Sequence, residues 1–302
     1  MKYAVLFSAF LAFASPALAA TYADVEAAYN AGSYDQARAI AEGLARSGDG
    51  RSAILLGTMY RDGKGVERNT DTAIDWFAMG AEAGNAEAQL DLAMIYLDTT
   101  SGRGDFERGA GWLRRAAESG LAGAQFNMGL LYSGALGNPP EMPIAAEWFR
   151  KAADQGHIGA EYNLGVLYLE GQGVAKDLIT AARLIGDAAQ HGNVDAMLDY
   201  GVLVIRGDGV QRDEKIGAQW LMVAASRGNI VAQNRVARLY AFGKGVAPDP
   251  VEAMKWNILA TRGGRPDAEL DTMLSRLSDK QKQEATARAD AFKPVVVNQP
   301  SG

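Results

Sequence analysis

The sequence predicts an all-α solenoid, a fold in which short helical repeats stack in one direction and each repeat packs on its neighbours. Two observations predict it. A pattern that is clearest in AEYNLGVLYLEGQGV (residues 160–174) recurs along the chain at multiples of 36 residues. All five tryptophans of the 302-residue chain fall at one position of this period. A fixed period of this length is typical of helical repeat arrays. The six copies begin at residues 52, 88, 124, 160, 196 and 232, so the repeat region spans residues 52–267.

The first half of each repeat is predicted to be a helix. Counted from the first residue of each copy, positions 1, 5 and 9 carry small or apolar side chains, and this spacing places them on one helical face. Position 6 is always Gly or Ala, although Gly inside a helix costs about 1 kcal/mol relative to Ala. We therefore expect another helix to pack too closely there for a larger side chain. The position 6 residues are Gly57, Ala93, Gly129, Gly165, Gly201 and Ala237.

The second half of each repeat is predicted to be another helix, which follows a Gly-x-Gly turn in four copies. An Asn or Asp before this helix can accept hydrogen bonds from its first N–H groups, and a glycine after it suits a left-handed C-terminal cap. The caps are Asn69, Asp105, Asp177, Asp213 and Asp249, and the glycines are Gly84, Gly120, Gly156, Gly192, Gly228 and Gly264. Seven residues after the cap position, we expect core wedges between repeats. They are Trp76, Trp112, Trp148, Leu184, Trp220 and Trp256.

This pattern resembles the Sel-one-like repeat (SLR), a relative of the tetratricopeptide repeat. The residues that carry the resemblance in the fourth repeat are Ala160, Leu164, Gly165, Tyr168, Gly171, Gly173, Val174, Ala181, Ala188, Ala189 and Gly192, with Leu184 in place of the family's Trp. The resemblance implies a right-handed superhelical α/α solenoid of 36-residue helix-turn-helix repeats. The family is defined by packing residues, so the resemblance predicts the fold and says little about function.

The two ends of the chain differ from the repeats. Residues 1–19 have the pattern of a cleaved signal peptide, with Lys2, an apolar segment and a small-x-small site that ends at Ala19. An uncleaved membrane anchor is the alternative. Residues 20–51 are expected to form a tetratricopeptide-like capping hairpin, residues 268–292 a partial repeat and capping helix that opens with a capping box at Ser278 and Gln281, and residues 293–302 a flexible tail. We expect a periplasmic or secreted protein without a further membrane span.

Composition and motifs argue against most catalytic chemistry. The net charge of −6 disfavours nucleic acid and anionic membranes as partners, and the absence of cysteine excludes thiol catalysis and disulfides. The Gly-x-Gly turns follow helices and not strands, so they do not predict a dinucleotide site. His157 and His191 are expected at the surface, and two histidines are a weak indication of a metal site. We expect no cofactor, no metal and no enzymatic activity.

A groove is the expected binding surface, because the resemblance implies that the first helices line the concave side of the solenoid. Aromatic and amide side chains there suit an extended peptide. The alternative is that the first helix is sandwiched and apolar all round for packing alone. The candidate groove residues are Phe126, Asn127, Leu130 and Ser133 in repeat three, Tyr162, Asn163, Val166 and Leu169 in repeat four, and Arg235 and Arg238 in repeat six. Asp91 and Asp98 in repeat two would make the groove electrostatically asymmetric.

Three functional classes follow from these observations. The first is a non-enzymatic periplasmic adaptor, a monomer that binds a partner protein or peptide in the groove and regulates an envelope signalling or cell-wall process. The second is a cell-wall-active or penicillin-binding enzyme, although the chain has no Ser-x-x-Lys with its supporting motifs. The third is a secreted host-interaction factor that uses the same groove.

Overall fold

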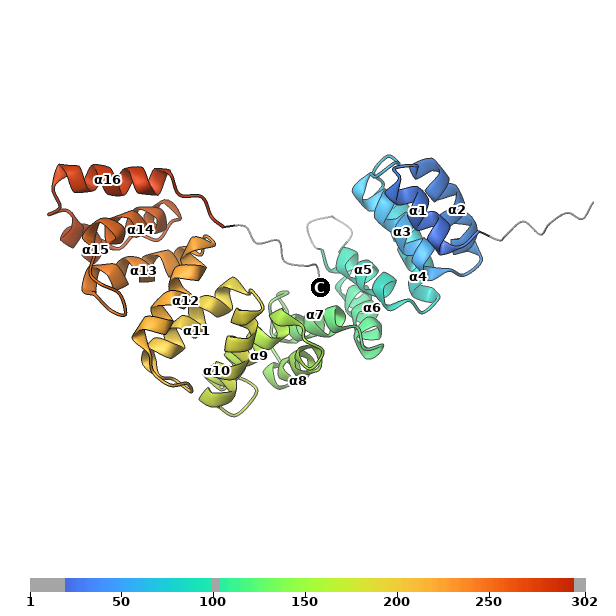
Figure 1. Cartoon of the computed structure of the whole chain (residues 1–302). Helices are drawn as coiled ribbons and strands as arrows, with labels where there is room; N and C mark the ends of the chain where they lie inside the picture. The colour runs from blue at the N-terminus through green and yellow to red at the C-terminus, as the bar shows by residue number, and fades with distance from the viewer. Residues whose placement is uncertain (1–19, 99–103, 296–302) are drawn as a thin grey trace, which may run out of the picture. The chain divides into compact units, whose positions relative to one another are not determined.

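The computed structural model describes residues 20–98 and 104–295, and these residues form helices and turns without strands (Figure 1). The expected signal peptide therefore lies outside the described residues. The chain divides into two compact units, Met1–Ala116 and Ala117–Gly302. Each unit is an array of helices that pack chiefly on their neighbours in sequence. The predicted fold class, an all-α solenoid of 36-residue helix pairs, is confirmed.

Unit 1 begins with a short helical hairpin and continues with repeat pairs. Its helices are α1 (Tyr22–Asn30), α2 (Tyr34–Arg46), α3 (Gly50–Asp62), α4 (Thr70–Glu82), α5 (Ala86–Leu97) and α6 (Phe106–Glu118), the last of which ends at the boundary between the units. The hairpin packs on α3 through a small core that includes Val25, Ala41 and Leu56. It buries one face of the first repeat, which a solenoid end requires.

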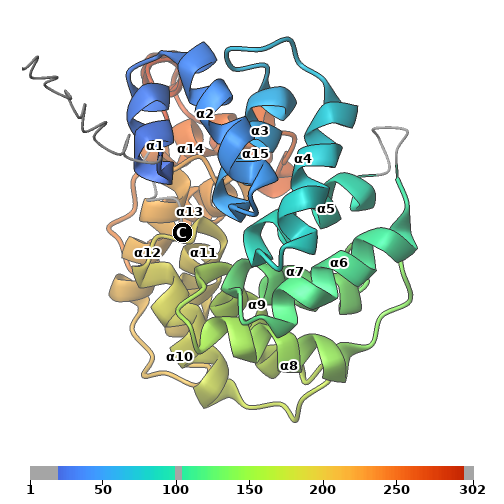
Figure 2. The same ribbon diagram turned by 90° about the vertical axis from the view of Figure 1, so that its right-hand side faces the viewer.

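Unit 2 holds the remaining helices in two rows. They are α7 (Ala122–Tyr132), α8 (Met142–Ala153), α9 (Ile158–Glu170), α10 (Leu178–Gln190), α11 (Val194–Arg206), α12 (Glu214–Ser226), α13 (Ile230–Phe242), α14 (Pro250–Arg262), α15 (Ala268–Leu274) and α16 (Asp279–Asp290). We call the first helices of the repeats, α7, α9, α11 and α13, the inner row of unit 2. Figure 2 shows α7, α9 and α11 inside α8, α10 and α12. The inner row is where the sequence predicts the groove.

The glycines at position 6 lie against large side chains of the second helix. A Cβ on Gly57 would lie 2.7 Å from the Phe77 ring, and one on Gly165 would lie 2.7 Å from Cγ1 of Ile185. The predicted close approach is therefore confirmed at these positions. We call this line of contacts the glycine seam. Its buried partners immediately follow the tryptophan position. They are Phe77, Phe149, Ile185 and Leu221.

The predicted wedges are only partly in the core. Leu184 and Trp256 are buried, whereas Trp148 is partly exposed. Three further tryptophans are partly exposed side chains that pack against core clusters: Trp76, Trp112 and Trp220. Cations cover several of the rings, with Lys151 Nζ 4.0 Å from the ring centroid of Trp148. One residue along a helix is a rotation of about 100°, so the next side chain, and not the tryptophan, points into the seam.

The Gly-x-Gly turn of repeat four shows why two glycines recur. Gly171 ends α9 with φ of 74°, a left-handed conformation that suits glycine. Gly173 also has a positive φ, and it lies against the backbone of Met142 at the start of α8 in the preceding repeat. The Asp177 N–H then donates to the carbonyl oxygen of Tyr168 (3.0 Å). The turn is thus a packing element between repeats.

The predicted helix caps are present. Asp177 accepts hydrogen bonds from the N–H groups of Ile179 and Thr180, and Asn69, Asp105, Asp213 and Asp249 accept equivalent bonds. The repeat-three loop differs, as expected. Glu141 caps α8 without a side-chain hydrogen bond. Its N–H still donates to the Tyr132 carbonyl oxygen (2.7 Å), so the loop closes in the same way. The varied loop of repeat two includes residues 99–103, which lie outside the described residues.

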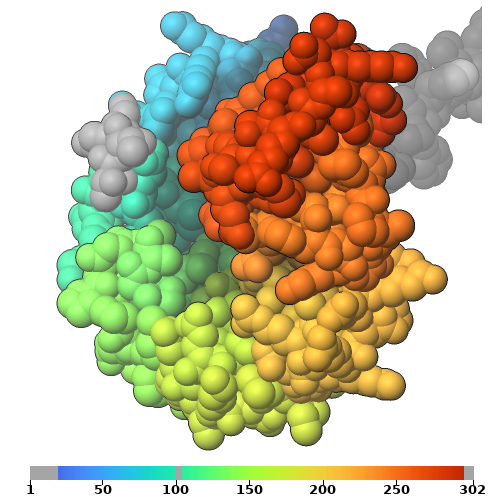
Figure 3. All heavy atoms as spheres, turned by 90° about the vertical axis from the view of Figure 1, so that its left-hand side faces the viewer, coloured from blue at the N-terminus to red at the C-terminus, as the bar shows by residue number. Residues whose placement is uncertain are grey.

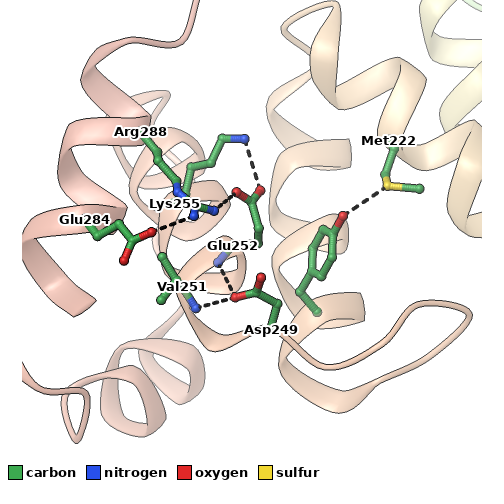
Figure 4. A network of polar contacts seen from close by, with 8 residues as sticks. Met222, Asp249, Val251, Glu252, Lys255, Glu284 and Arg288 are labelled. Carbon is green, nitrogen blue, oxygen red and sulfur yellow. Dashed lines mark hydrogen bonds and ion pairs between the residues drawn. The ribbon is translucent and has the colours of Figure 1, made fainter. Parts of the chain in front are cut away.

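The C-terminal end of unit 2 is closed by α16, which begins with the predicted capping box at Ser278 and Gln281. α16 packs on α14, and in the space-filling view the red helix lies over the neighbouring orange part of the chain (Figure 3). Figure 4 shows the polar contacts of this end: Glu252 of α14 accepts from Lys255 (3.1 Å) and from Arg288 of α16 (2.6 Å).

The chain leaves α16 in contact with an earlier repeat. The Val295 N–H donates to the carbonyl oxygen of Ser226 (2.9 Å), and Pro294 lies near Gly228. These contacts involve the first residues of the segment 293–302, whose flexibility remains a prediction. The rest of that segment lies outside the described residues.

Candidate functional site

The predicted groove residues of repeat three serve mainly to pack the helices. Phe126 stacks on the His157 ring with centroids 4.4 Å apart and also contacts Phe149. Leu130 joins the same hydrophobic cluster. His157 caps α9 by accepting a hydrogen bond from the Ala160 N–H, and burial lowers the pKa of its imidazole. The prediction of a surface histidine is therefore wrong at this residue, which is half-buried, whereas His191 is exposed.

The two predicted amides are partly used by their own helices. Asn127 Nδ2 donates to the Gly123 carbonyl oxygen (2.9 Å), and Asn163 Nδ2 donates to that of Gly159 (2.7 Å). Ser133 Oγ likewise donates to the Leu130 carbonyl oxygen. Short polar side chains commonly form such bonds to the preceding turn. The amide Oδ1 atoms remain the groups that these asparagines offer to a ligand.

Tyr162 of α9 joins two neighbouring repeats. Its hydroxyl donates to Oδ2 of Asp199 on α11 (2.9 Å). Burial, with the nearby carboxylate, raises the pKa of Tyr162, so the hydroxyl keeps its proton at neutral pH. Burial also raises the pKa of Asp199, although the Tyr162 hydrogen bond and Arg235 oppose that shift. This pair fixes a carboxylate on the inner row.

A hollow of about 590 Å³ lies beside this pair, between α9, α11 and α13. Tyr162, Val166, Leu169 and Glu170 line it from α9, and Lys176 and Leu178 line it from the following turn and the start of α10. Asp199, Val202, Leu203 and Arg206 line it from α11, with Asp208 from the next turn and Arg235 from α13. We call it the inner hollow. It gathers Tyr162, Val166, Leu169 and Arg235 from the predicted set and combines apolar surface with charges of both signs.

Arg235 stands out among the arginines of unit 2. It is half-buried, its Nε is buried without a hydrogen-bond partner, and no carboxylate of the described chain forms an ion pair with it. Burial lowers the pKa of its guanidinium, and the neighbouring Arg206 adds to that effect, while the Asp199 carboxylate opposes it. A buried donor without an acceptor is costly, and perturbed charged groups are common at functional sites.

Arg238, one turn further along α13, has a structural role. Its Nε lies 2.7 Å from Oδ2 of Asp267, and Glu269 contacts the same guanidinium (3.0 Å). Asn234 also donates to Asp267 (2.9 Å), which is 9% exposed. Burial would raise the pKa of Asp267, but these hydrogen bonds outweigh it and lower the pKa to about 2. Arg238 therefore ties α13 to the start of α15.

In unit 1, the predicted acidic residues are also part of local structure. Asp91 lies 3.1 Å from Arg61 Nη1, and burial raises the pKa of its carboxyl despite this pairing. Asp98 is the extended residue that ends α5. The asymmetry expected from these acids and the repeat-six arginines remains a prediction, because each unit is described by itself.

Sequence reasoning missed Asp199, Arg206 and the acids Glu170 and Asp208. The signal that could have found Asp199 is the succession of residues at position 4, where Asn127 and Asn163 give way to Asp199 and then Arg235. A change of charge at a position that packing does not constrain indicates a surface with another role.

Within the described ranges, no group of three His, Asp or Glu side chains is placed to bind a metal ion. None of the helices described here is both long and apolar enough to cross a membrane.

The repeated helix pairs, with a constant seam and a variable inner row, define a helical repeat scaffold. The particular family follows from its sequence model: the Sel1 repeat model matches residues 50–85, 86–121, 122–157, 158–193, 194–229 and 230–264. The chain belongs to the Sel1 repeat family, as its resemblance predicted. Proteins of this family are generally protein–protein interaction scaffolds without enzymatic activity.

Two solved structures extend the comparison. The chain is similar to a Sel1 repeat protein from Oxalobacter formigenes, with 30% identity and a TM-score of 0.70 over 80% of this chain and 100% of that one. It is also similar to c5321, described as a protective antigen present in uropathogenic Escherichia coli strains that displays an SLR fold. There the identity is 27% and the TM-score 0.57, over 86% of this chain and 64% of that one. No curated protein matches the chain.

Proposed function

We propose that this protein is an exported, non-enzymatic adaptor, a monomer that binds a segment of a partner protein across the inner row of unit 2. The observation that carries the proposal is the inner hollow. It exposes Val166, Leu169 and Val202 beside the fixed Tyr162–Asp199 pair and beside Arg235, whose Nε has no hydrogen-bond acceptor. Apolar area with a few oriented polar groups is the usual composition of a peptide-binding surface.

A photo-crosslinking residue at Val166, in the full-length chain in cells, tests this surface. We expect it to capture one partner, identified by mass spectrometry. The matched control is the same residue at Ile179, which is 73% exposed on α10 outside the hollow. The purified partner should then bind the Val166→Arg variant at least tenfold more weakly than the wild type, because the new arginine side chain fills the hollow. Equal capture at both positions, or unchanged affinity of Val166→Arg, would reject the inner row as the binding surface.

Export is the second part of the proposal, and it rests on the signal-peptide pattern of residues 1–19. Mass spectrometry of the protein from a periplasmic or culture-medium fraction should find an N-terminus at or next to Ala20. A mature protein that keeps residues 1–19, or one confined to the cytosol, would contradict export.

A role in host contact is the second candidate, because one similar structure is described as a protective antigen. Surface labelling of intact cells distinguishes the two candidates. Labelling of intact cells, or recovery from the medium, favours host contact. Labelling that requires a permeabilised outer membrane favours the periplasmic adaptor.

A further inference from the structure

Three arginines of repeats five and six, Arg206, Arg235 and Arg265, form a cation cluster. Arg206 and Arg235 line the inner hollow together. Burial and the charges of Arg206 and Arg265 lower the pKa of Arg235, although the nearby Asp199 carboxylate opposes this shift. Over the described residues, none of the three takes part in an ion pair, whereas Arg238, one turn from Arg235, is held by Asp267. The orphaned Nε of Arg235 is buried, so it has given up solvent without gaining an acceptor. An anion bound here would supply that acceptor.

A small apolar pocket adjoins the cluster. It has a volume of about 160 Å³, and Val202, Ile205, Leu221 and Leu239 form its apolar lining. Arg206, Arg235 and Arg238 also line it, and it shares Val202, Arg206 and Arg235 with the inner hollow. The two recesses are therefore adjacent. An aliphatic side chain fits the apolar part while an adjacent anionic group contacts the guanidinium groups.

The acids of the same hollow limit what the anion is. Glu170, Asp199 and Asp208 line the inner hollow with the arginines. A nucleic acid or another polyanion would meet these carboxylates and be repelled. A peptide with a single carboxylate is repelled less by these acids and can contact the arginines, while its N–H groups donate to the acids. Arginine binds carboxylates through two parallel hydrogen bonds, which gives this contact direction as well as charge.

We propose that Arg206 and Arg235 bind one carboxylate of a partner's peptide segment, and that the aliphatic residue next to it occupies the pocket over Leu221 and Leu239. This inference rests on the proposed function and names the chemistry of its ligand. The carboxylate is either an Asp or Glu side chain or the end of the partner chain.

The test is a selection from a library of random nonapeptides with free C-termini, displayed on their encoding nucleic acid and captured by the full chain. We expect enrichment of an acidic residue, or of the C-terminus itself, beside Leu, Ile, Val or Met. The same selection uses the variant Arg206→Gln/Arg235→Gln, which should lose this enrichment. Arg183→Gln is the matched control, because Arg183 is an exposed arginine of α10 that pairs with Asp187. Circular dichroism and urea midpoints confirm that each variant folds.

Synthetic versions of the best peptide then distinguish the sources of the anion. Replacing its acid by the matching amide should weaken binding at least tenfold in the wild type and less than twofold in the double variant. If a C-terminal amide has this effect instead, the chain end is the ligand group. Tighter binding of a phosphoserine version, or an acid effect that persists in the double variant, would overturn the proposal. So would enriched peptides without a carboxylate at the pocket, or no enrichment at all.

Failure of the inference is separable from failure of the proposed function. If the partner captured at Val166 binds the wild type and the Arg206→Gln/Arg235→Gln variant equally, the surface stands and the carboxylate site is wrong. If Val166 captures no specific partner, the proposed function fails first.

Discussion

The glycine seam and the inner row of unit 2 follow the same 36-residue period, but the seam keeps similar residues in each repeat and the inner row does not. In the seam, Gly165 against Ile185 repeats the arrangement of Gly57 against Phe77 in unit 1, with small differences in the large partner. In the inner row, position 4 changes from Asn163 to Asp199. Packing tolerates few residue types at a close approach, whereas a half-exposed position is free to vary. The difference separates the residues that make the fold from those that give this copy of the fold its chemistry.

The largest effect is expected in the seam, and it is tested by replacing each of two glycines of unit 1 with alanine. Gly57→Ala places a Cβ 2.7 Å from the Phe77 ring, while Gly43→Ala in α2 places one where no atom lies within 4 Å. Overpacking costs up to about 3 kcal/mol, and Ala in an open helix gains up to about 1 kcal/mol. Urea unfolding followed by circular dichroism should show Gly57→Ala about 3 kcal/mol less stable than Gly43→Ala. Equal stabilities of the two variants would mean that the seam accommodates a Cβ at Gly57 without strain.

The next effect concerns the place where an inner-row helix is fixed by charge. Asp267→Asn should lower the free energy of unfolding by about 2 kcal/mol at neutral pH, because the folded carboxyl has a pKa of about 2 against a reference of 3.8. Since the folded pKa is the lower one, this stabilisation is complete above about pH 5 and disappears as the pH falls through about 2. Urea midpoints of both proteins across this range should therefore converge in acid. A difference that does not change with pH would assign the loss to packing.

Much of this was predictable from the sequence, and the reason is locality. Caps such as Asp177 and the close approach at Gly165 depend on neighbours within one repeat, so the period reveals them. The choice between Trp76 and Phe77 as the buried residue depends on the helix rotation, which a spacing of seven residues leaves open. The pairing of Tyr162 with Asp199 depends on how one repeat is turned against the next, and no residue spacing encodes that angle.

A smaller effect is expected where the seam itself departs from its pattern. Asn257 occupies the buried position that Leu221 holds one repeat earlier. Its Nδ2 donates to Asp271 (2.6 Å), while its Oδ1 is buried without a partner. Asn257→Leu should therefore raise the free energy of unfolding by about 1 kcal/mol, because it removes the orphaned acceptor and leaves the exposed Asp271 to water. Urea unfolding decides the sign. A loss of stability would show that the hydrogen bond to Asp271 contributes more than the unsatisfied Oδ1 of Asn257 costs.

The smallest effect is expected on the inner row. Arg235→Gln should change the free energy of unfolding by less than about 0.5 kcal/mol, because removing a partly buried charge offsets the lost attraction to Asp199 and no close ion pair is broken. Arg238→Gln is the matched comparison on the same helix and should be clearly less stable, because it leaves Asp267 without its guanidinium partner. Thermal melts of the two variants should fall in that order. The reverse order would place Arg235 among the residues that hold the fold.

The contact between Val295 and Ser226 has a consequence for how the array opens. Repeat arrays lose their end helices first, one after another, because each contacts only its neighbours. Here the chain beyond α16 returns to Ser226 at the end of α12, so α16 separates from α14 freely only after that hydrogen bond breaks. The amide hydrogens of α13, α14 and α16 should then exchange with solvent as one cooperative group. The closing residues thus behave as a latch that couples the opening of the last helix to the opening of an earlier repeat.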